Sequence, residues 1–212
     1  LLVIVFCREI PGAARQTGGL KPFLNRHELI LTVIAGLVWG FFNAGYVIYL
    51  SFAPDVLIAS GYDKVSALAV ISLASWLMII SGVVCGLIAD KSGKSDLILN
   101  VCIAMAILAL VMLFFTSLAI PSSLLFGLIG VAPAGVVMAL TGQAMKPENR
   151  AIGMGLFFAV YFLVMTLSPP IAGWLFDLTT DQVWPMLFAG ALFLLTAVAN
   201  AAFRATQKRL LI

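Results

Sequence analysis

The sequence predicts an all-α membrane protein in which six transmembrane helices form one bundle. Of its 212 residues, 63% are hydrophobic and only 10% are charged, whereas a soluble domain has about 25% charged residues. The apolar residues fall into six blocks of membrane-spanning length. The loops between these blocks alternate between rich and poor in Lys and Arg, which fixes both the helix count and the orientation.

The six blocks give the expected helices. A hydrocarbon core about 30 Å thick requires about 20 residues at a rise of 1.5 Å per residue, and each block has 21 to 26 residues. A charge at a helix centre costs about 2.5–3.5 kcal/mol, and the blocks contain almost no ionisable residues between their ends. In chain order the blocks are 28–51, 65–89, 97–118, 121–145, 151–176 and 183–203.

The distribution of basic residues predicts the orientation. Lys and Arg gather in cytoplasmic loops, and eleven of the twelve lie in 7–27, 90–96, 146–150 and the C-terminal tail, leaving only Lys64 in the opposite set of loops. We therefore expect these four segments to be cytoplasmic in an integral, multi-pass protein of a bacterial inner membrane. The eleven residues are Arg8, Arg15, Lys21, Arg26, Lys91, Lys94, Lys146, Arg150, Arg204, Lys208 and Arg209.

The segments outside the blocks predict the domain organisation. The apolar run 1–6 is too short for a signal peptide, and we expect it to be the end of a preceding transmembrane helix. Residues 7–27, rich in Gly, Pro and basic residues, would then be a cytoplasmic linker. The six-helix bundle would occupy 28–204, and 205–212 would be a cytoplasmic tail.

A short stretch after the second block, GLIADKSGKSD, carries the most specific motif. Its Gly93-Lys94-Ser95 resembles the end of a phosphate-binding loop, but that loop needs a glycine five residues earlier, where this chain has Ile88. Instead, Gly86, Asp90, Lys91, Gly93 and Lys94 match the G-x-x-x-D-[RK]-x-G-[RK] signature. The chain therefore resembles transporters of the major facilitator superfamily.

This resemblance implies the C-terminal half of such a transporter, with the six blocks as helices 7 to 12. It implies a half-bundle of the major facilitator fold, secondary active transport of a small solute by alternating access, and an N-terminal six-helix half as partner. The motif would latch one conformation. We expect Gly86 to allow close approach of a helix, Gly93 to adopt a positive φ, and Asp90 to cap a helix or pair with Arg150 or Lys94.

A second stretch, 146–177, is similar to helix 11 of the same family, because it combines a basic loop, Gly-x-Gly, an aromatic helix and Pro169-Pro170. The short linker and this helix are weakly similar to cyanate- and nitrate-type members, whose substrates are small anions. A generic exporter of drugs or metabolites stays an equal alternative. We also expect helix kinks at Pro133, Pro169 and Pro170, since proline removes a helix hydrogen bond, which at Pro133 would free the carbonyl of Ile129.

The family fold implies that the first and fourth blocks line the central cavity and that the third and sixth face lipid. On the first block, Asn43 lies about 22 Å along the helix from Glu28, within the membrane. A cavity or an interhelical hydrogen bond would satisfy its amide. We name six candidates for lining a substrate cavity, with helix packing as the alternative for each: Trp39, Asn43, Tyr46, Trp76, Tyr161 and Met165.

Other chemistry lacks support. No ionisable residue lies deep in a block, so a coupling group or a counter-charge for the substrate is expected outside this chain. Three cysteines, Cys7, Cys85 and Cys102, form no recognisable disulfide or metal pattern, and His27 has no catalytic or metal-binding partners. We expect no enzyme activity, cofactor, metal site or nucleic-acid partner. A non-transporting scaffold or receptor and an integral membrane enzyme are the alternatives.

Overall fold

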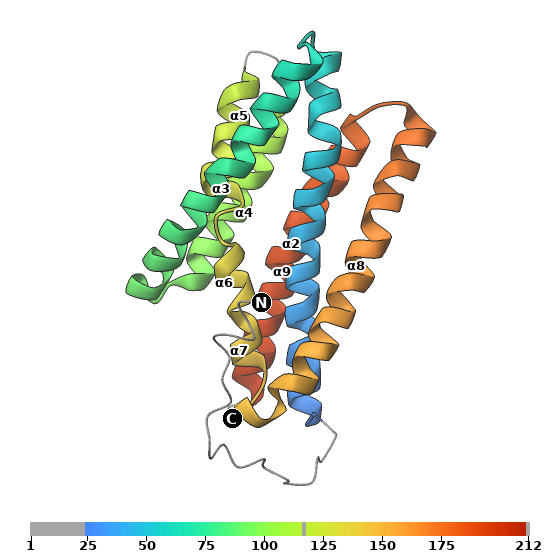
Figure 1. The fold of residues 1–212 in the computed structure, drawn as a ribbon. Helices are drawn as coiled ribbons and strands as arrows, with labels where there is room; N and C mark the ends of the chain where they lie inside the picture. Colours follow the sequence, from blue (N-terminus) through green and yellow to red (C-terminus); the bar gives the residue numbers. More distant parts are fainter. Residues whose placement is uncertain (1–23, 116–117, 211–212) are drawn as a thin grey trace, which may run out of the picture.

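The computed structural model describes residues 24–115 and 118–210, and these residues are helical apart from short connections (Figure 1). Residues 1–23, which hold the predicted helix end 1–6 and most of the predicted linker 7–27, lie outside the described residues, as do 116–117 and 211–212, and the last two linker residues already belong to α2. The elements are α2 (Arg26–Ala59), α3 (Lys64–Ser92), α4 (Ser95–Leu113), α5 (Ala119–Leu125), η2 (Phe126–Gly130), α6 (Ala134–Met138), α7 (Leu140–Ala144), η3 (Pro147–Asn149), α8 (Arg150–Thr179) and α9 (Val183–Leu210).

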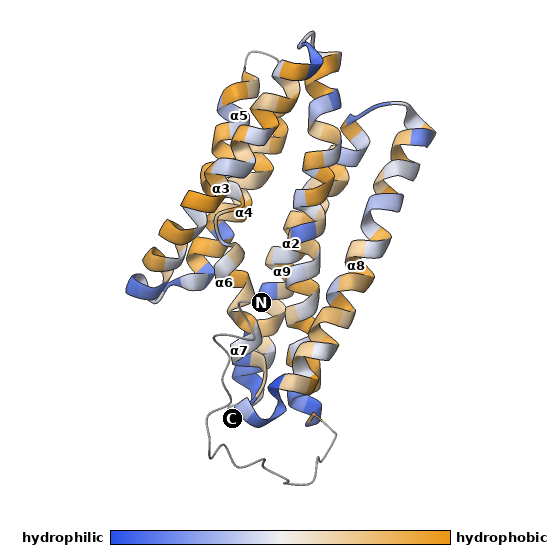
Figure 2. Cartoon of the chain, in the orientation of Figure 1, coloured by the Kyte–Doolittle hydropathy of each residue, from blue (hydrophilic) through white to orange (hydrophobic). Residues whose placement is uncertain are grey.

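The predicted fold class is confirmed, because the described residues contain six helical segments long and apolar enough to cross a membrane and contain no strand. The fourth of these segments, Ala119–Ala144, is built from α5, η2, α6 and α7. Apolar residues cover the middle of the helices, and hydrophilic residues gather near their ends and turns (Figure 2). This pattern matches an apolar slab bounded by water on both sides.

The six segments form two groups of three. α2 packs along both α8 and α9, while α3 and α4 enclose η2 and α5. Contacts of α4 with α9, and of α2 with α3 and α7, join the two groups. In Figure 1 the start of α2, the α7–α8 connection and the end of α9 lie at the lower end, and the α3–α4 turn points to the same side. The alternation predicted from the basic residues is therefore reproduced in space.

The turns are formed by capping residues that the sequence supplies locally. Asp63 caps α3, since its Oδ1 accepts hydrogen bonds from the N–H groups of Val65 and Ser66 at 3.0 and 3.1 Å. Gly93 ends α3 with φ of 64°, and its N–H donates to the carbonyl of Ala89. Only glycine adopts this backbone region without strain, so the predicted positive φ at Gly93 is confirmed.

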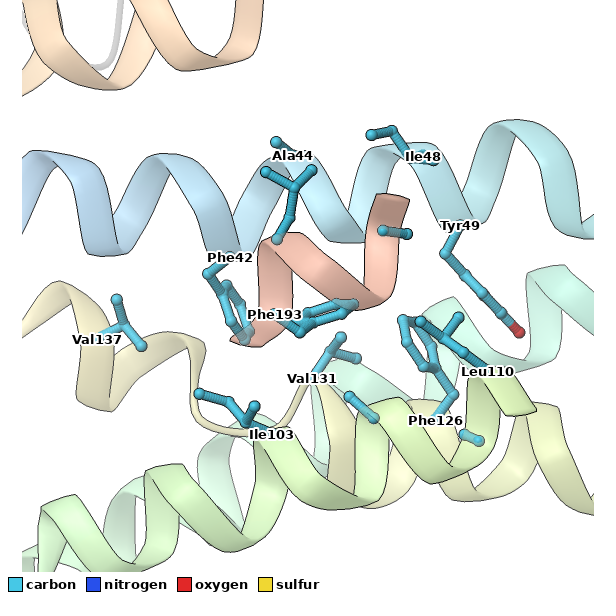
Figure 3. Close-up of a cluster of buried hydrophobic side chains, with 14 of the residues drawn as sticks. Phe42, Ala44, Ile48, Tyr49, Ile103, Leu110, Phe126, Val131, Val137 and Phe193 are labelled. Carbon is cyan, nitrogen blue, oxygen red and sulfur yellow. The ribbon is translucent and has the colours of Figure 1, made fainter. Parts of the chain in front are cut away.

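The core lies where α2, α4, α9 and the fourth segment meet (Figure 3). Phe126 of η2 is fully buried, stacks on Tyr49 of α2 at 3.8 Å between ring centroids, and meets Phe193 of α9 edge-on at 5.9 Å. Phe42 packs edge-on against Phe193 from the next turns of α2. Such aromatic pairs contribute about 0.5–1.5 kcal/mol each beyond their buried area, so η2 is held firmly between the two groups.

The fourth segment is interrupted at its middle, which differs from the predicted simple kink at Pro133. η2 ends at Gly130, and α6 begins only after Pro133. We expected Pro133 to leave the carbonyl of Ile129 free, but this oxygen accepts a hydrogen bond from the N–H of Ala132 at 3.3 Å. The local turn replaces the missing helical bond, so the break carries no unpaired carbonyl at Ile129.

Close backbone packing holds the interrupted segment against its neighbours. A Cβ atom added to Gly127 would lie 2.3 Å from the carbonyl oxygen of Ala74 on α3, so only glycine fits there. The hydroxyl of Ser81, two turns along α3, donates to the carbonyl of Gly127 at 2.9 Å. Small residues that let helix backbones approach are typical of membrane interiors.

Burial differs strongly among the six segments. In the most apolar stretch of each, half of the residues of α2 and of the fourth segment are buried, against 17% in α3 and 22% in the α8 segment. The third and sixth segments, α4 and α9, lie between these values at 39%. That α4 and α9 face lipid stays a prediction, and within this chain α3 and α8 present the largest uncovered apolar faces.

Candidate functional site

The candidate site is a partly exposed strip on α2, formed by Trp39, Asn43, Tyr46 and Leu50, which we call the α2 strip. These residues are spaced at i, i+4, i+7 and i+11 and therefore share one helix face. All four are half-buried, whereas neighbours such as Val38 and Phe42 are buried. The strip is one of two faces of α2 that the described residues leave partly uncovered, the other carrying Ile34, Leu37 and Phe41.

Tyr161 of α8 lies against the α2 strip. Its ring is 6.3 Å from the ring of Trp39, with the two planes tilted by 39°. Met165, one turn further along α8, is half-buried and packs against the hydrophobic core. The structure thus brings together Trp39 and Tyr161, which are far apart in the sequence, across the α2–α8 interface.

Tyr46 connects the strip to α3. Its hydroxyl and that of Ser75 form a hydrogen bond of 3.2 Å, and its ring stacks on Phe126 at 6.4 Å. The neighbouring Trp76, which we expected to line the cavity, is 71% exposed within this chain, and its place in a cavity stays a prediction. Successive residues of an α-helix are rotated by about 100°, so Ser75 faces α2 and Trp76 does not.

The amide of Asn43 is used within its own helix. Its Nδ2 donates to the backbone carbonyl of Trp39 at 2.8 Å. The interhelical hydrogen bond that we considered as an alternative is not found among the described residues. The local bond lowers the cost of an amide at this depth and leaves the residue part of the strip.

Five motif residues lie at the end of α3 and in the turn that follows. Gly86 was expected to allow a close helix approach, but a Cβ added there would meet nothing within 4 Å among the described residues. Lys91, Gly93 and Lys94 are exposed. Asp90 is also exposed, and the described residues show no ion pair between it and Arg150 or Lys94. The expected partners of Gly86 and Asp90 are therefore not found among residues 24–115 and 118–210.

The ion pair near this motif is formed by residues that sequence reasoning missed. Asp96, in the first turn of α4, accepts a hydrogen bond from Nε of Arg204 at 2.8 Å and another from the side chain of Asn200 at 3.2 Å. Arg204 also donates to the side-chain oxygens of Gln143 and Gln207. A signal existed, because Asn200 and Arg204 share one face of α9 at i and i+4.

A cavity of about 280 Å³ separates the motif from this polar network. Gly86 and Asp90 line it from α3, and Gln143 and Arg204 line it from α7 and α9. Gly135 of α6, beyond the break at Pro133, also lines it. With Ser95 of α4, residues of four segments thus surround one cavity.

The remaining proline positions do not interrupt their helix. α8 continues through Pro169 and Pro170 from Arg150 to Thr179. The hydroxyl of Ser168 donates to the carbonyl of Val164 at 2.8 Å, within the turn that precedes these prolines. No group of three or more His, Cys, Asp or Glu residues that could hold a metal ion occurs in the part of the chain that the structure describes.

Comparison with known proteins gives one informative relationship. The chain is 34% identical over 73 residues to monocarboxylate transporter 12 of Xenopus laevis. The aligned stretch covers 34% of this chain and only 16% of that relative. No family model matches the chain, and no solved structure matches it.

This relative is a transporter, which supports a membrane transport protein over an enzyme. Its name gives no support to the resemblance with cyanate- and nitrate-type members, and its amphibian source gives none to a bacterial inner membrane.

Proposed function

We propose that this chain is the C-terminal six-helix half of a secondary transporter of the major facilitator type, which moves a small solute by alternating access. The observation that carries the proposal is the similarity to a monocarboxylate transporter in a chain with six membrane-length helices. The motif of Gly86, Asp90, Lys91, Gly93 and Lys94 at the α3–α4 turn supports the same family.

The uncovered faces of α3 and α8 support a second bundle as partner. Both helices flank α2, and both carry large exposed apolar residues such as Ile80, Val83, Phe162 and Leu163. Between them lie the hydroxyl of Tyr46 and the amide of Asn43. Hydrocarbon offers no hydrogen-bond partner to such groups, so we assign this side of the bundle to a water-filled cavity between two halves.

Within that cavity, the α2 strip and Tyr161 form the wall that this chain contributes. Trp39 and Tyr161 supply aromatic surface, and Tyr46, Ser75 and Asn43 supply neutral polar groups. Transporters place substrate near the midplane between their repeats and rock one bundle against the other. Pro133 lies at the interruption of the fourth segment, which gives that helix a place to bend during such a movement.

The substrate class follows from the relative and from the charge of the wall. We propose a small organic anion with one carboxylate, in keeping with the name of the relative. No Asp, Glu, His, Lys or Arg lies deep in the six blocks, so the counter-charge and any proton-coupling group come from the other half. The basic turns at 90–96 and 146–150 are assigned to the cytoplasmic side by their Lys and Arg content.

Uptake by the full-length protein in liposomes tests the proposal. We expect accumulation of a labelled short-chain monocarboxylate that is saturable and is competed by unlabelled monocarboxylates, while nitrate and cyanate compete poorly. A Trp39→Ala variant should reduce uptake, whereas Leu194→Ala on an exposed face of α9 should not. Full-length protein that inserts correctly and moves no solute of this class, under any gradient, would contradict the proposal and favour a scaffold, receptor or enzyme.

A further inference from the structure

The α3–α4 hairpin brings two free cysteines together. Cys85 lies eight residues before the turn at Gly93, and Cys102 lies nine residues after it. At a rise of about 1.5 Å per residue, both side chains sit at nearly the same distance from the turn. They belong to one buried cluster, with relative exposures of 7% and 6%, and both side chains line the same cavity.

An apolar cavity adjoins this pair of thiols. It has a volume of about 340 Å³ and is lined by Cys85, Cys102 and apolar residues of α3, α4 and the fourth segment, among them Val84, Leu128 and Ala132. For comparison, a protein cavity of about 150 Å³ with apolar walls binds benzene. The space beside the two sulfurs is therefore large enough for an aromatic ring.

From this geometry we propose that Cys85, Cys102 and the adjoining cavity form a dithiol site for a neutral, apolar thiophile, of which a trivalent organoarsenical is the chemical type. Two thiolates bind the soft centre, and the cavity holds its aromatic group. The site is distinct from the α2 strip, because it lies between α3, α4 and the fourth segment and contains none of the strip residues.

Charge and coordination select this class of ligand. Zinc requires four ligands, and the described residues offer no third His, Cys, Asp or Glu beside this pair. A monovalent soft cation held by two thiolates would leave a net negative charge in an apolar membrane interior, which is costly. An arsenic centre that carries one aromatic carbon and two thiolates is neutral and satisfies both sulfurs.

The binding step needs no oxidant. With phenylarsine oxide, two S–H bonds and the arsenic–oxygen double bond break, and two As–S bonds form. The two thiol protons leave with the oxygen as one water molecule, and arsenic stays trivalent. The product links α3 covalently to α4 and fastens the hairpin that carries the motif residues.

The test uses the full chain in detergent micelles with phenylarsine oxide as the probe. After a wash with excess monothiol, intact mass spectrometry should find one phenylarsenic unit on the wild-type protein, released by a small dithiol. The variants Cys85→Ser and Cys102→Ser keep one thiol of the pair each. They should lose the probe on the order of 10²-fold faster than the wild type, because a second As–S bond to the same protein slows dissociation by about this factor. Cys7→Ser should retain it like the wild type.

A matched control separates the geometry from the number of thiols. The double variant Cys102→Ser with Val101→Cys keeps two thiols in the hairpin but places the second on a half-exposed face of α4, and it should lose the probe as fast as Cys102→Ser alone. Thermal melts of each variant report folding. The proposal would be overturned if the wild-type protein lost the probe during the monothiol wash. It would also be overturned if the Cys7→Ser variant lost the probe, regardless of the results with the other variants.

Discussion

The side-chain amide of Asn149 donates a 2.7 Å hydrogen bond to Oε2 of Glu28, joining positions 121 residues apart. The other oxygen of Glu28 accepts from the backbone N–H of Lys146 at 2.9 Å, and Oε2 also accepts from the N–H of Asn25 at 3.2 Å. Glu28 is 8% exposed. One buried carboxylate thus caps α2 and anchors the turn that leads into α8.

Replacing Glu28 by Ala should destabilise the bundle markedly. The change removes the acceptor shared by the part-buried donors of Asn25, Lys146 and Asn149, and each such hydrogen bond contributes about 0.5–1.5 kcal/mol. Glu28→Gln should cost less, since one amide oxygen remains. Unfolding of the purified chain in detergent, followed by heat or denaturant, measures both effects. Glu148→Gln, at an exposed neighbour, is the control, and an equal loss there would argue against this anchor.

The Asp96–Arg204 pair should contribute modestly and depend on salt. Their side chains are 48% and 22% exposed, and exposed ion pairs contribute about 0.2–1 kcal/mol. Arg204→Ala should cost more than Asp96→Asn, because Arg204 also donates to Gln143 and Gln207. A double-mutant cycle at low and high salt measures the coupling, with exposed Lys208 as the site of a control substitution. Additive effects at both salt concentrations would show that the pair is energetically silent.

Two glycines of the fourth segment should respond oppositely to alanine. At Gly127 the new Cβ would lie 2.3 Å from a backbone oxygen of Ala74, so Gly127→Ala should cost about 1–3 kcal/mol through overpacking. At Gly142 nothing lies within 4 Å, and Gly142→Ala should stabilise α7 by about 0.5–1 kcal/mol. The melting temperatures of the two variants in detergent measure both stability changes. A Gly127→Ala protein as stable as the wild type would contradict the close crossing of the fourth segment with α3.

Variants of the α2 strip should alter solute affinity before they alter stability. Tyr161→Ala removes the ring that faces Trp39 and should raise the KM of uptake several-fold. The control change Leu194→Ala, on a 58% exposed face of α9, should leave KM unchanged. Uptake kinetics in liposomes give both values. Equal effects at the two positions would mean that Tyr161 acts through packing alone.

Labelling from each side of the membrane should reproduce the predicted orientation. In a protein without its native cysteines, single cysteines at Lys94 and Arg150 should react with an impermeant maleimide only from the cytoplasmic side. A cysteine at Asp181, in the α8–α9 connection, should react only from the opposite side. All three positions are exposed. If the cysteines introduced at positions 94 and 181 reacted from the same side, the alternation of the loops, and with it the helix count, would be contradicted.

The fold was largely predictable because its signals are local. Block length and loop charge depend only on neighbouring residues and on the thickness of a bilayer, so six helices and the positive φ at Gly93 were expected correctly. The shared face of Trp39, Asn43 and Tyr46 followed from helical periodicity. That Trp76 lines the cavity stays a prediction, because depth along a helix says nothing about which way the helix is rotated toward its neighbours.

The polar contacts at the helix ends were not predictable in the same way. Asp90 and Asp96 lie close to the α3–α4 turn on either side of it, and only the packing of α9 against α4 decides that Asp96 meets Arg204. Gly86 and Gly127 look alike in an apolar helix, yet only Gly127 touches a neighbouring backbone. Such choices depend on contacts between segments far apart in the chain.

By itself, the sequence determined that this protein is a bundle of six membrane-length helices with its basic turns on one side, since burying apolar side chains in lipid and keeping charges in water are properties of each segment separately. Tertiary structure alone decided that α2 is central, that Gly127 of the fourth segment crosses α3 at Ala74, and that Cys85 and Cys102 share a cavity. In lipid the hydrophobic effect no longer favours one helix pairing over another, so close packing and a few hydrogen bonds select the arrangement.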